Sequence, residues 1–130
     1  MSDVAILLVD DEKTVLDSLK AQFRRSFGTG YLYETAENAA EAWEVVDQLC
    51  SDGIRLVAVV CDWLMPGVCG DAFLADVHRR LPNTVCILLT GHTDERVIRW
   101  VCREGGVARV IRKPWRFADI QTEIESGMMR

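Results

Sequence analysis

The chain has 130 residues, of which 49% are hydrophobic and 27% are charged, and its formal net charge at pH 7 is −5. This length is typical of one domain, and the composition excludes disordered, collagen-like and membrane-embedded classes of protein. The negative charge makes the phosphate backbone of nucleic acids an unfavourable direct ligand.

We expect a cytoplasmic protein, because no charged leader opens the chain and no apolar run approaches the roughly 20 residues of a membrane span. The five cysteines are Cys50, Cys61, Cys69, Cys86 and Cys102, an odd set without C-x-x-C spacing. They are expected to be reduced and mostly buried. We interpret residues 1–130 as one domain, and an N-terminal domain excised from a longer protein is compatible with the sequence.

Apolar runs and helical patterns alternate along the chain, which predicts a parallel sheet connected by crossover helices. The first run, VAILLV at residues 4–9, precedes a helix with apolar residues every three or four positions from Val15 to Phe27. YLYETA at residues 31–36 predicts a second strand. Asn38 and Glu41 then predict a capping box. The helix that they begin should bury Ala39, Ala42, Trp43, Val46 and Leu49.

The second half of the chain continues the same alternation. RLVAVVC at residues 55–61 predicts the third strand, and TVCILLT at residues 84–90 predicts the fourth. The helix between them should bury Phe73, Leu74 and Val77, and the helix after residue 90 should bury Val97, Ile98, Val101 and Cys102. VARVI at residues 107–111 predicts the fifth strand, and a last helix should bury Phe117, Ile120 and Ile124.

The polarity of the runs predicts the order of the strands. The first, third and fourth runs are continuously apolar, as central parallel strands are, whereas the other two contain polar residues and suit the edges. Right-handed crossovers then favour the order 2-1-3-4-5, which is a doubly wound, flavodoxin-like α/β fold. Ligands of such folds bind outside the carboxyl ends of the strands.

Polar side chains follow four of the predicted strands at this edge. They are Asp10, Asp11 and Glu12 after the first strand, Asp62 after the third, Thr90 after the fourth and Lys113 after the fifth. Two carboxylates about 5 Å apart repel by roughly 3 kcal/mol at an effective dielectric constant near 20. A shared proton would relieve this repulsion. Oxygen ligands of this kind also suit Mg²⁺, which is our preferred interpretation.

A carboxylate beside Mg²⁺ can attack phosphorus and form an acyl phosphate. Asp62 is the candidate phosphoacceptor, Lys113 would pair with a phosphoryl oxygen, and the Thr90 hydroxyl would donate a hydrogen bond to another. Each residue also has an ordinary explanation, because acids favour helix starts and a lone lysine is usually solvated. The joint placement of these residues favours the site, and Glu12 is expected to remain only a helix residue.

The motifs LLVDDE, VVCDWLMPG, ILLTG and VIRKPW together resemble the receiver domain of bacterial two-component response regulators. The resemblance implies that Asp62 is phosphorylated and that Asp11 binds Mg²⁺ directly, with Asp10 acting partly through water. It also implies that the backbone carbonyl of Leu64 completes the metal site and that the Lys113-Pro114 bond is cis. The implied partners are a histidine kinase or phosphotransfer protein and an effector or output domain, and a homodimer is compatible with the resemblance.

The sequence departs from this family at Val110, where an aromatic residue is usual, so output is expected to run through loop and helix shifts around Thr90. Leu64 and His92 lie where the family tunes the loss of the phosphoryl group. Trp63 is expected to shield the entrance of the site and to report metal binding. Arg96, Arg99 and Arg103 form a basic stripe that could dock a partner.

Three other functions remain open at this point. A phosphorylation-independent pseudo-receiver is slightly favoured by Val110 and disfavoured by the complete set of acids, threonine and lysine. An aspartate-nucleophile phosphatase needs a second acid two residues after the nucleophile, where this chain has Leu64. A flavin mononucleotide binder needs a hydroxyl- and glycine-rich loop after the first strand, where this chain has acids. We therefore expect a regulatory phosphoacceptor domain and no turnover enzyme.

Overall fold

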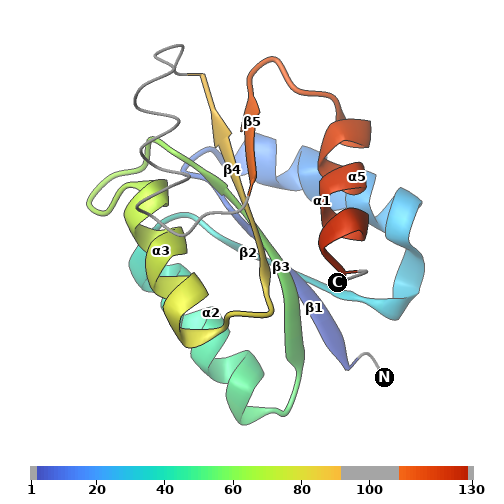
Figure 1. The fold of residues 1–130 in the computed structure, drawn as a ribbon, viewed down its shortest axis with the longest axis vertical. Coiled ribbons are helices and arrows are strands. Elements are labelled where there is room, and N and C mark those ends of the chain that lie inside the picture. The colour runs from blue at the N-terminus through green and yellow to red at the C-terminus, as the bar shows by residue number, and fades with distance from the viewer. Residues whose placement is uncertain (1–2, 92–108, 129–130) are drawn as a thin grey trace.

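The computed structural model describes residues 3–91 and 109–128, and Figure 1 shows their arrangement. The elements are β1 (Val4–Val9), α1 (Lys13–Phe27), the 3₁₀ turn η1 (Gly28–Gly30), β2 (Leu32–Ala36), α2 (Ala39–Ser51), β3 (Arg55–Asp62), α3 (Gly70–Arg80), β4 (Val85–Thr90), β5 (Arg109–Arg112) and α5 (Phe117–Met128). The predicted helix after residue 90, with the arginine stripe and His92, lies outside the described residues.

The strands form one five-stranded parallel sheet in the order β2-β1-β3-β4-β5, which confirms the predicted topology. The three continuously apolar strands lie in the middle, and the two mixed strands lie at the edges. Central parallel strands are covered by helices on both faces, so they carry apolar residues at almost every position.

Helices cover both faces of this sheet, with α1 and α5 on one side and α2 and α3 on the other (Figure 1). Alternate strand residues therefore belong to different cores. Leu7, Val59 and Leu88 pack with the buried faces of α2 and α3. On the opposite face, Leu8 and Ile87 belong to the cluster that contains the buried residues of α1 and α5.

Four strand boundaries differ from the predicted ones by one residue. β3 continues to Asp62, because this residue still pairs with Leu89 of β4. β4 begins only at Val85, because Thr84 belongs to the preceding turn, where its hydroxyl donates to the carbonyl of Leu56 at 2.8 Å. β2 begins at Leu32, and β5 extends to Arg112, one residue further than predicted.

The helix starts follow the sequence pattern, but residues of the predicted buried faces such as Trp43 and Phe117 are only partly buried. The backbone N–H of Glu41 donates to Asn38 Oδ1 at 2.8 Å, so Asn38 caps α2 as predicted. Trp43 is only half-buried, which corrects the prediction that it is a core residue. Its indole meets the Phe73 ring edge-on at 5.3 Å between centroids, and the guanidinium of Arg80 covers it at 4.6 Å.

The cysteines are less uniformly buried than the sequence predicts. Cys61 and Cys86 are buried, whereas Cys50 and Cys69 are exposed, and none of these four forms a disulfide. Burial raises the pKa of the Cys86 thiol to about 12 and that of Cys61 well above its ordinary value, so both remain protonated at neutral pH. Among the helices described, none combines the length and apolar character needed to span a membrane.

Candidate functional site

The first two acids of the site stand directly after β1. The backbone N–H of Asp10 donates to the carbonyl of Ala36 at 3.1 Å, so the pairing with β2 continues one residue beyond β1. The Asp10 side chain is only 3% exposed, and its Oδ1 accepts a hydrogen bond from the N–H of Glu12 at 2.9 Å. Asp11 is exposed. Glu12 occupies the N-cap position of α1, where its side chain makes no cap hydrogen bond.

Asp62 reaches the same edge from β3. Val9 pairs with Cys61, so Asp10 and Asp62 each follow that pair at the carboxyl ends of neighbouring strands. Asp62 is 7% exposed. Carboxylate oxygens of Asp10, Asp11 and Asp62 lie within 4.8 Å of one another. The structure therefore brings together the three acids that the sequence places after two different strands.

The fourth and fifth strands contribute a hydroxyl and an ammonium group to this edge. Thr90 is buried and follows Leu89, the residue paired with Asp62. The backbone N–H of Lys113 donates to the carbonyl of Thr90 at 2.7 Å, and Lys113 Nζ lies 2.7 Å from Asp62 Oδ1. The Lys113-Pro114 peptide bond is cis, as the family resemblance implies.

Electrostatics at this edge favour the uptake of positive charge. Burial is the largest effect on Asp10 and raises the pKa of its carboxyl to about 6, although the Glu12 N–H stabilises the charged form. The negative charge of Asp62 raises this pKa further, and Lys113 lowers it. Burial is the largest single effect on Lys113 and lowers its pKa, but the hydrogen bond to Asp62 and the nearby negative charges, those of Asp62 and Asp10 first among them, together outweigh burial, so the pKa of Lys113 is raised.

This donor set fits a small divalent cation. Three carboxylates converge from two strand ends and face one ammonium group, which leaves an excess of negative charge when all are ionised. Carboxylate oxygens are the ligands that Mg²⁺ prefers, and one exposed acid leaves room for the waters that Mg²⁺ retains. The site therefore has the oxygen chemistry, the charge and the access that the ion requires.

The loop from Trp63 to Cys69 borders the acids. The N–H of Trp63 donates to the Leu89 carbonyl at 2.9 Å, and Leu64 is 68% exposed. The Trp63 indole packs against the core on the α3 side and donates from Nε1 to Asp71 Oδ1 at 3.1 Å. Sequence reasoning missed Asp71. Its position in the first turn of α3 was the available signal, but the indole contact depends on the path of the loop.

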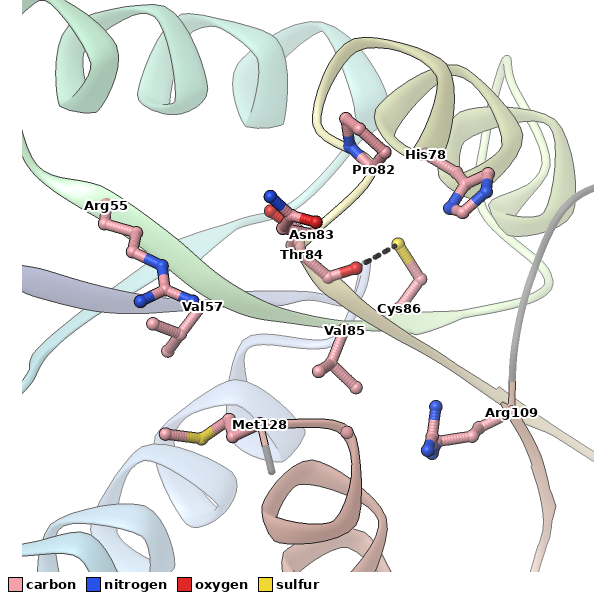
Figure 2. Close-up of a pocket in the computed structure, with 11 residues that line it drawn as sticks. Arg55, Val57, His78, Pro82, Asn83, Thr84, Val85, Cys86, Arg109 and Met128 are labelled. Atoms are coloured by element: carbon pink, nitrogen blue, oxygen red, sulfur yellow. Dashed lines mark hydrogen bonds between the residues drawn. The ribbon is translucent and has the colours of Figure 1, made fainter. Parts of the chain in front are cut away.

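A pocket of about 400 Å³ lies at the other end of the sheet, at the amino ends of β3, β4 and β5. Figure 2 shows Arg55, Val85 and Arg109 in its lining, together with the contact of 3.8 Å between Cys86 Sγ and the carbonyl of Thr84. None of the predicted site residues lines this pocket. The acids instead lie at the opposite edge of the sheet, so this pocket and the reactive groups do not coincide.

Comparisons with known proteins address the family. The profile of the response regulator receiver domain matches residues 6–125. The hydrogenase transcriptional regulatory protein HoxA of Cupriavidus necator is 33% identical over 117 residues, which are 88% of this chain and 22% of that protein. This chain thus spans much less than two thirds of that relative.

Solved structures agree with the profile. A response regulator receiver domain protein from Clostridium thermocellum is 27% identical and superposes with a TM-score of 0.84, covering 98% of this chain and 95% of that one. A chain described as adenylate cyclase from Rhodopirellula baltica is also 27% identical, with a TM-score of 0.81 over 99% of this chain and 89% of that one.

The sheet order, the acids at two neighbouring strand ends and the profile match agree over nearly the whole chain. Phosphoacceptor signalling is the function of domains of this kind. The chain belongs to the response regulator receiver domain family.

Proposed function

We propose that Asp62 is the phosphoacceptor of a Mg²⁺-dependent signalling switch. The observation that carries this proposal is the position of Asp62, which shares one cluster with Asp10 and Asp11 and pairs with Lys113 Nζ at 2.7 Å. Asp62 is also the residue that the resemblance to receiver domains assigns to this role. Residues 1–130 constitute one receiver domain in this proposal.

The transfer begins with a phosphohistidine of a histidine kinase or phosphotransfer protein. A carboxylate oxygen of Asp62 attacks the phosphorus, the phosphorus–nitrogen bond breaks, and the donor imidazole keeps the electron pair and takes up a proton. Lys113 would move from Asp62 to a phosphoryl oxygen as charge builds there, and the Thr90 hydroxyl would donate to another oxygen. Hydrolysis of the acyl phosphate by water returns the carboxylate and inorganic phosphate.

The metal would be held by the side chains of Asp10, Asp11 and Asp62 and by the backbone carbonyl of Leu64. When bound, Mg²⁺ supplies positive charge that offsets the repulsion between the carboxylates and the incoming phosphoryl group. The protein residues contribute a prearranged anionic cluster, in which the buried Asp10 is fixed by the Glu12 N–H. Such fixed ligands require little rearrangement when the ion arrives.

The output would be a shift between two conformations rather than turnover of a substrate. The chemistry of the domain would be limited to phosphorylation and dephosphorylation of its own Asp62. The domain would act in the cytoplasm without direct contact to nucleic acid or membrane. The relatives described above include a transcriptional regulatory protein and an adenylate cyclase, so similar domains accompany different outputs. The altered surface would recognise the effector. This effector is an attached output domain, a separate protein or a second copy in a homodimer.

The test is phosphorylation by a small-molecule donor. Intact mass of the parent should increase by one phosphoryl group with acetyl phosphate or phosphoramidate in the presence of Mg²⁺, and not after chelation of the metal. Asp62→Asn should show no increase, because an amide is a far weaker nucleophile than a carboxylate. Asp52→Asn, which changes an exposed aspartate in the C-cap of α2, is the matched control and should label like the parent. An unlabelled parent, or an Asp62→Asn variant that labels equally, contradicts the proposal.

The pseudo-receiver is the second candidate, and Val110 is the observation that favours it. This residue is half-buried and packs against the core on the α2 and α3 side, where the family usually has an aromatic residue. The same phosphorylation experiment separates the candidates, because a pseudo-receiver gains no mass. The phosphatase alternative is disfavoured because the exposed Leu64 side chain has no proton to donate.

A further inference from the structure

The loop that follows Asp62 is fastened to its surroundings at both ends. At its start, the Trp63 N–H donates to the carbonyl of Leu89 in β4. At its end, the Gly70 N–H donates to the carbonyl of Trp63 at 2.8 Å, which closes the loop at its base. Gly70 lies so close to β3 that a Cβ atom there would be 2.2 Å from the carbonyl oxygen of Asp62.

A side-chain hydrogen bond fastens the same loop to α3. Trp63 Nε1 donates to Asp71 Oδ1 at 3.1 Å in a partly buried setting. Asp71 lies in the first turn of α3, where the helix dipole favours a negative charge. Cys69 at the N-cap makes no side-chain cap, so Asp71 supplies the side-chain hydrogen bond at this end of the helix. Asp71 therefore joins the helix start to the residue directly after Asp62.

Leu64 depends on its neighbours for its position. Its side chain is 68% exposed and contributes little packing, whereas Met65 is buried and its Sδ lies 3.9 Å from Cys61 Sγ. Leu64 thus lies between two anchored residues, Trp63 and Met65. Without either side-chain anchor, the backbone around Leu64 would be held only by the hydrogen bonds of the Trp63 peptide groups, and backbone ligands of a metal need fixed supports.

We infer that Asp71 is a positioning residue of the metal site, because its bond to the Trp63 indole fixes the backbone that presents the carbonyl of Leu64. The inference rests on the proposed function, since it concerns the Mg²⁺ site proposed there. Asp71 touches neither the ion nor the phosphoryl group, and it acts only through Trp63. The indole hydrogen bond, rather than the charge of Asp71, is the element that matters.

Binding of Mg²⁺ alone, measured by isothermal titration calorimetry, tests this inference. Asp71→Ala and Trp63→Phe should each weaken Mg²⁺ binding by roughly threefold to tenfold, as losses of outer-shell support do. Asp71→Asn should bind almost like the parent, because its amide oxygen still accepts from the indole. The double variant Asp71→Ala with Trp63→Phe should be no weaker than either single variant, since both remove the same bond.

Controls separate positioning from folding. Asp119→Ala removes an exposed acid from the first turn of α5, on the opposite face of the sheet from α3, and should bind Mg²⁺ like the parent. Thermal unfolding in the presence of a chelator should show that all variants are folded. The inference is overturned if Asp71→Ala binds within about twofold of the parent, if Asp71→Asn is as weak as Asp71→Ala, or if the two single effects multiply. A parent that binds no Mg²⁺ refutes the proposed function instead.

Discussion

Asp10 and Asp11 are adjacent in the sequence, yet their side chains are in different environments. Asp10 is buried and accepts a hydrogen bond from the Glu12 backbone, whereas Asp11 is exposed. Burial disfavours the charged form of a carboxylate, which is why the pKa of Asp10 is raised to about 6. Folding without metal therefore forces an unfavourable charge on Asp10 at neutral pH, and a bound cation would remove that cost.

This difference predicts a pH-dependent response to Mg²⁺. The folded pKa of Asp10 exceeds its ordinary value of 3.8, so the folded state retains a proton that the unfolded state releases, and metal-free stability falls as pH rises toward 6. Protons and Mg²⁺ compete for this carboxylate. The rise in unfolding temperature caused by Mg²⁺ should be larger at about pH 7.5 than at about pH 5, as calorimetry would measure.

Asp10→Asn provides the reciprocal measurement. It removes the buried charge while its amide oxygen still accepts from Glu12, so we expect the metal-free variant to gain about 1–3 kcal/mol of stability near neutral pH. The Mg²⁺ response should shrink at every pH. Asp3→Asn, at an exposed aspartate before β1, is the control. A pH-independent Mg²⁺ response in the parent would show that Asp10 does not titrate in this range.

At the scale of elements, α5 depends on one close contact with the sheet. Gly127 lies in the last turn of α5, and a Cβ atom there would be 2.5 Å from Val85 Cγ2 and 3.3 Å from Val85 Cβ. Val85 is buried and its branched side chain has few alternative rotamers. The absence of a side chain at Gly127 therefore allows the end of α5 to approach β4.

Gly127→Ala tests this contact, because local and tertiary effects have opposite signs. Helix propensity alone predicts that alanine stabilises the helix by roughly 1 kcal/mol. Overpacking against a buried valine costs roughly 1–3 kcal/mol, so we expect a net loss of stability in chemical denaturation. Ser126→Ala, at the exposed neighbouring position, should change stability by less than about 0.5 kcal/mol. A stabilised Gly127→Ala variant would show that α5 moves away from the sheet at little cost.

At the scale of the whole molecule, two cores share one sheet. Phe23 of α1 is fully buried on one face and contacts the rings of Tyr33 and Phe117, with centroids 6.2 Å and 4.8 Å away. Phe73 of α3 is fully buried on the other face and contacts Trp43. Each central strand contributes alternate side chains to both cores. Loss of one core would therefore expose one face of the sheet on which the other core is built.

We therefore expect one cooperative unfolding transition. Phe23→Ala and Phe73→Ala should each lower the free energy of unfolding by about 3–5 kcal/mol, because each leaves a cavity in a packed core. Far-ultraviolet circular dichroism and tryptophan fluorescence should report coincident transitions for the parent and for both variants. Separate transitions, or a variant in which only one probe shifts, would show that the two faces unfold independently.

The strands illustrate how far the sequence alone leads. The continuously apolar runs predicted the central strands, and right-handed crossovers then left few arrangements for the sheet. The same reasoning placed Asp10, Asp62, Thr90 and Lys113 at one edge, because side chains after parallel strands share that edge. The same reasoning overestimated the burial of Trp43, Cys50 and Cys69. The apolar character of a residue does not show how far its side chain lies from the sheet.

The sequence by itself determined the class of fold, the strand order and the set of residues at the reactive edge. The reason is that strand and helix periodicities are local properties, which can be recognised without knowing the tertiary contacts. Only the tertiary structure decided which acid is buried, which side chain holds Trp63 and where α5 needs a glycine. These features depend on distances between residues far apart in the chain, such as Gly127 and Val85, and those distances are set by how each helix packs against the sheet.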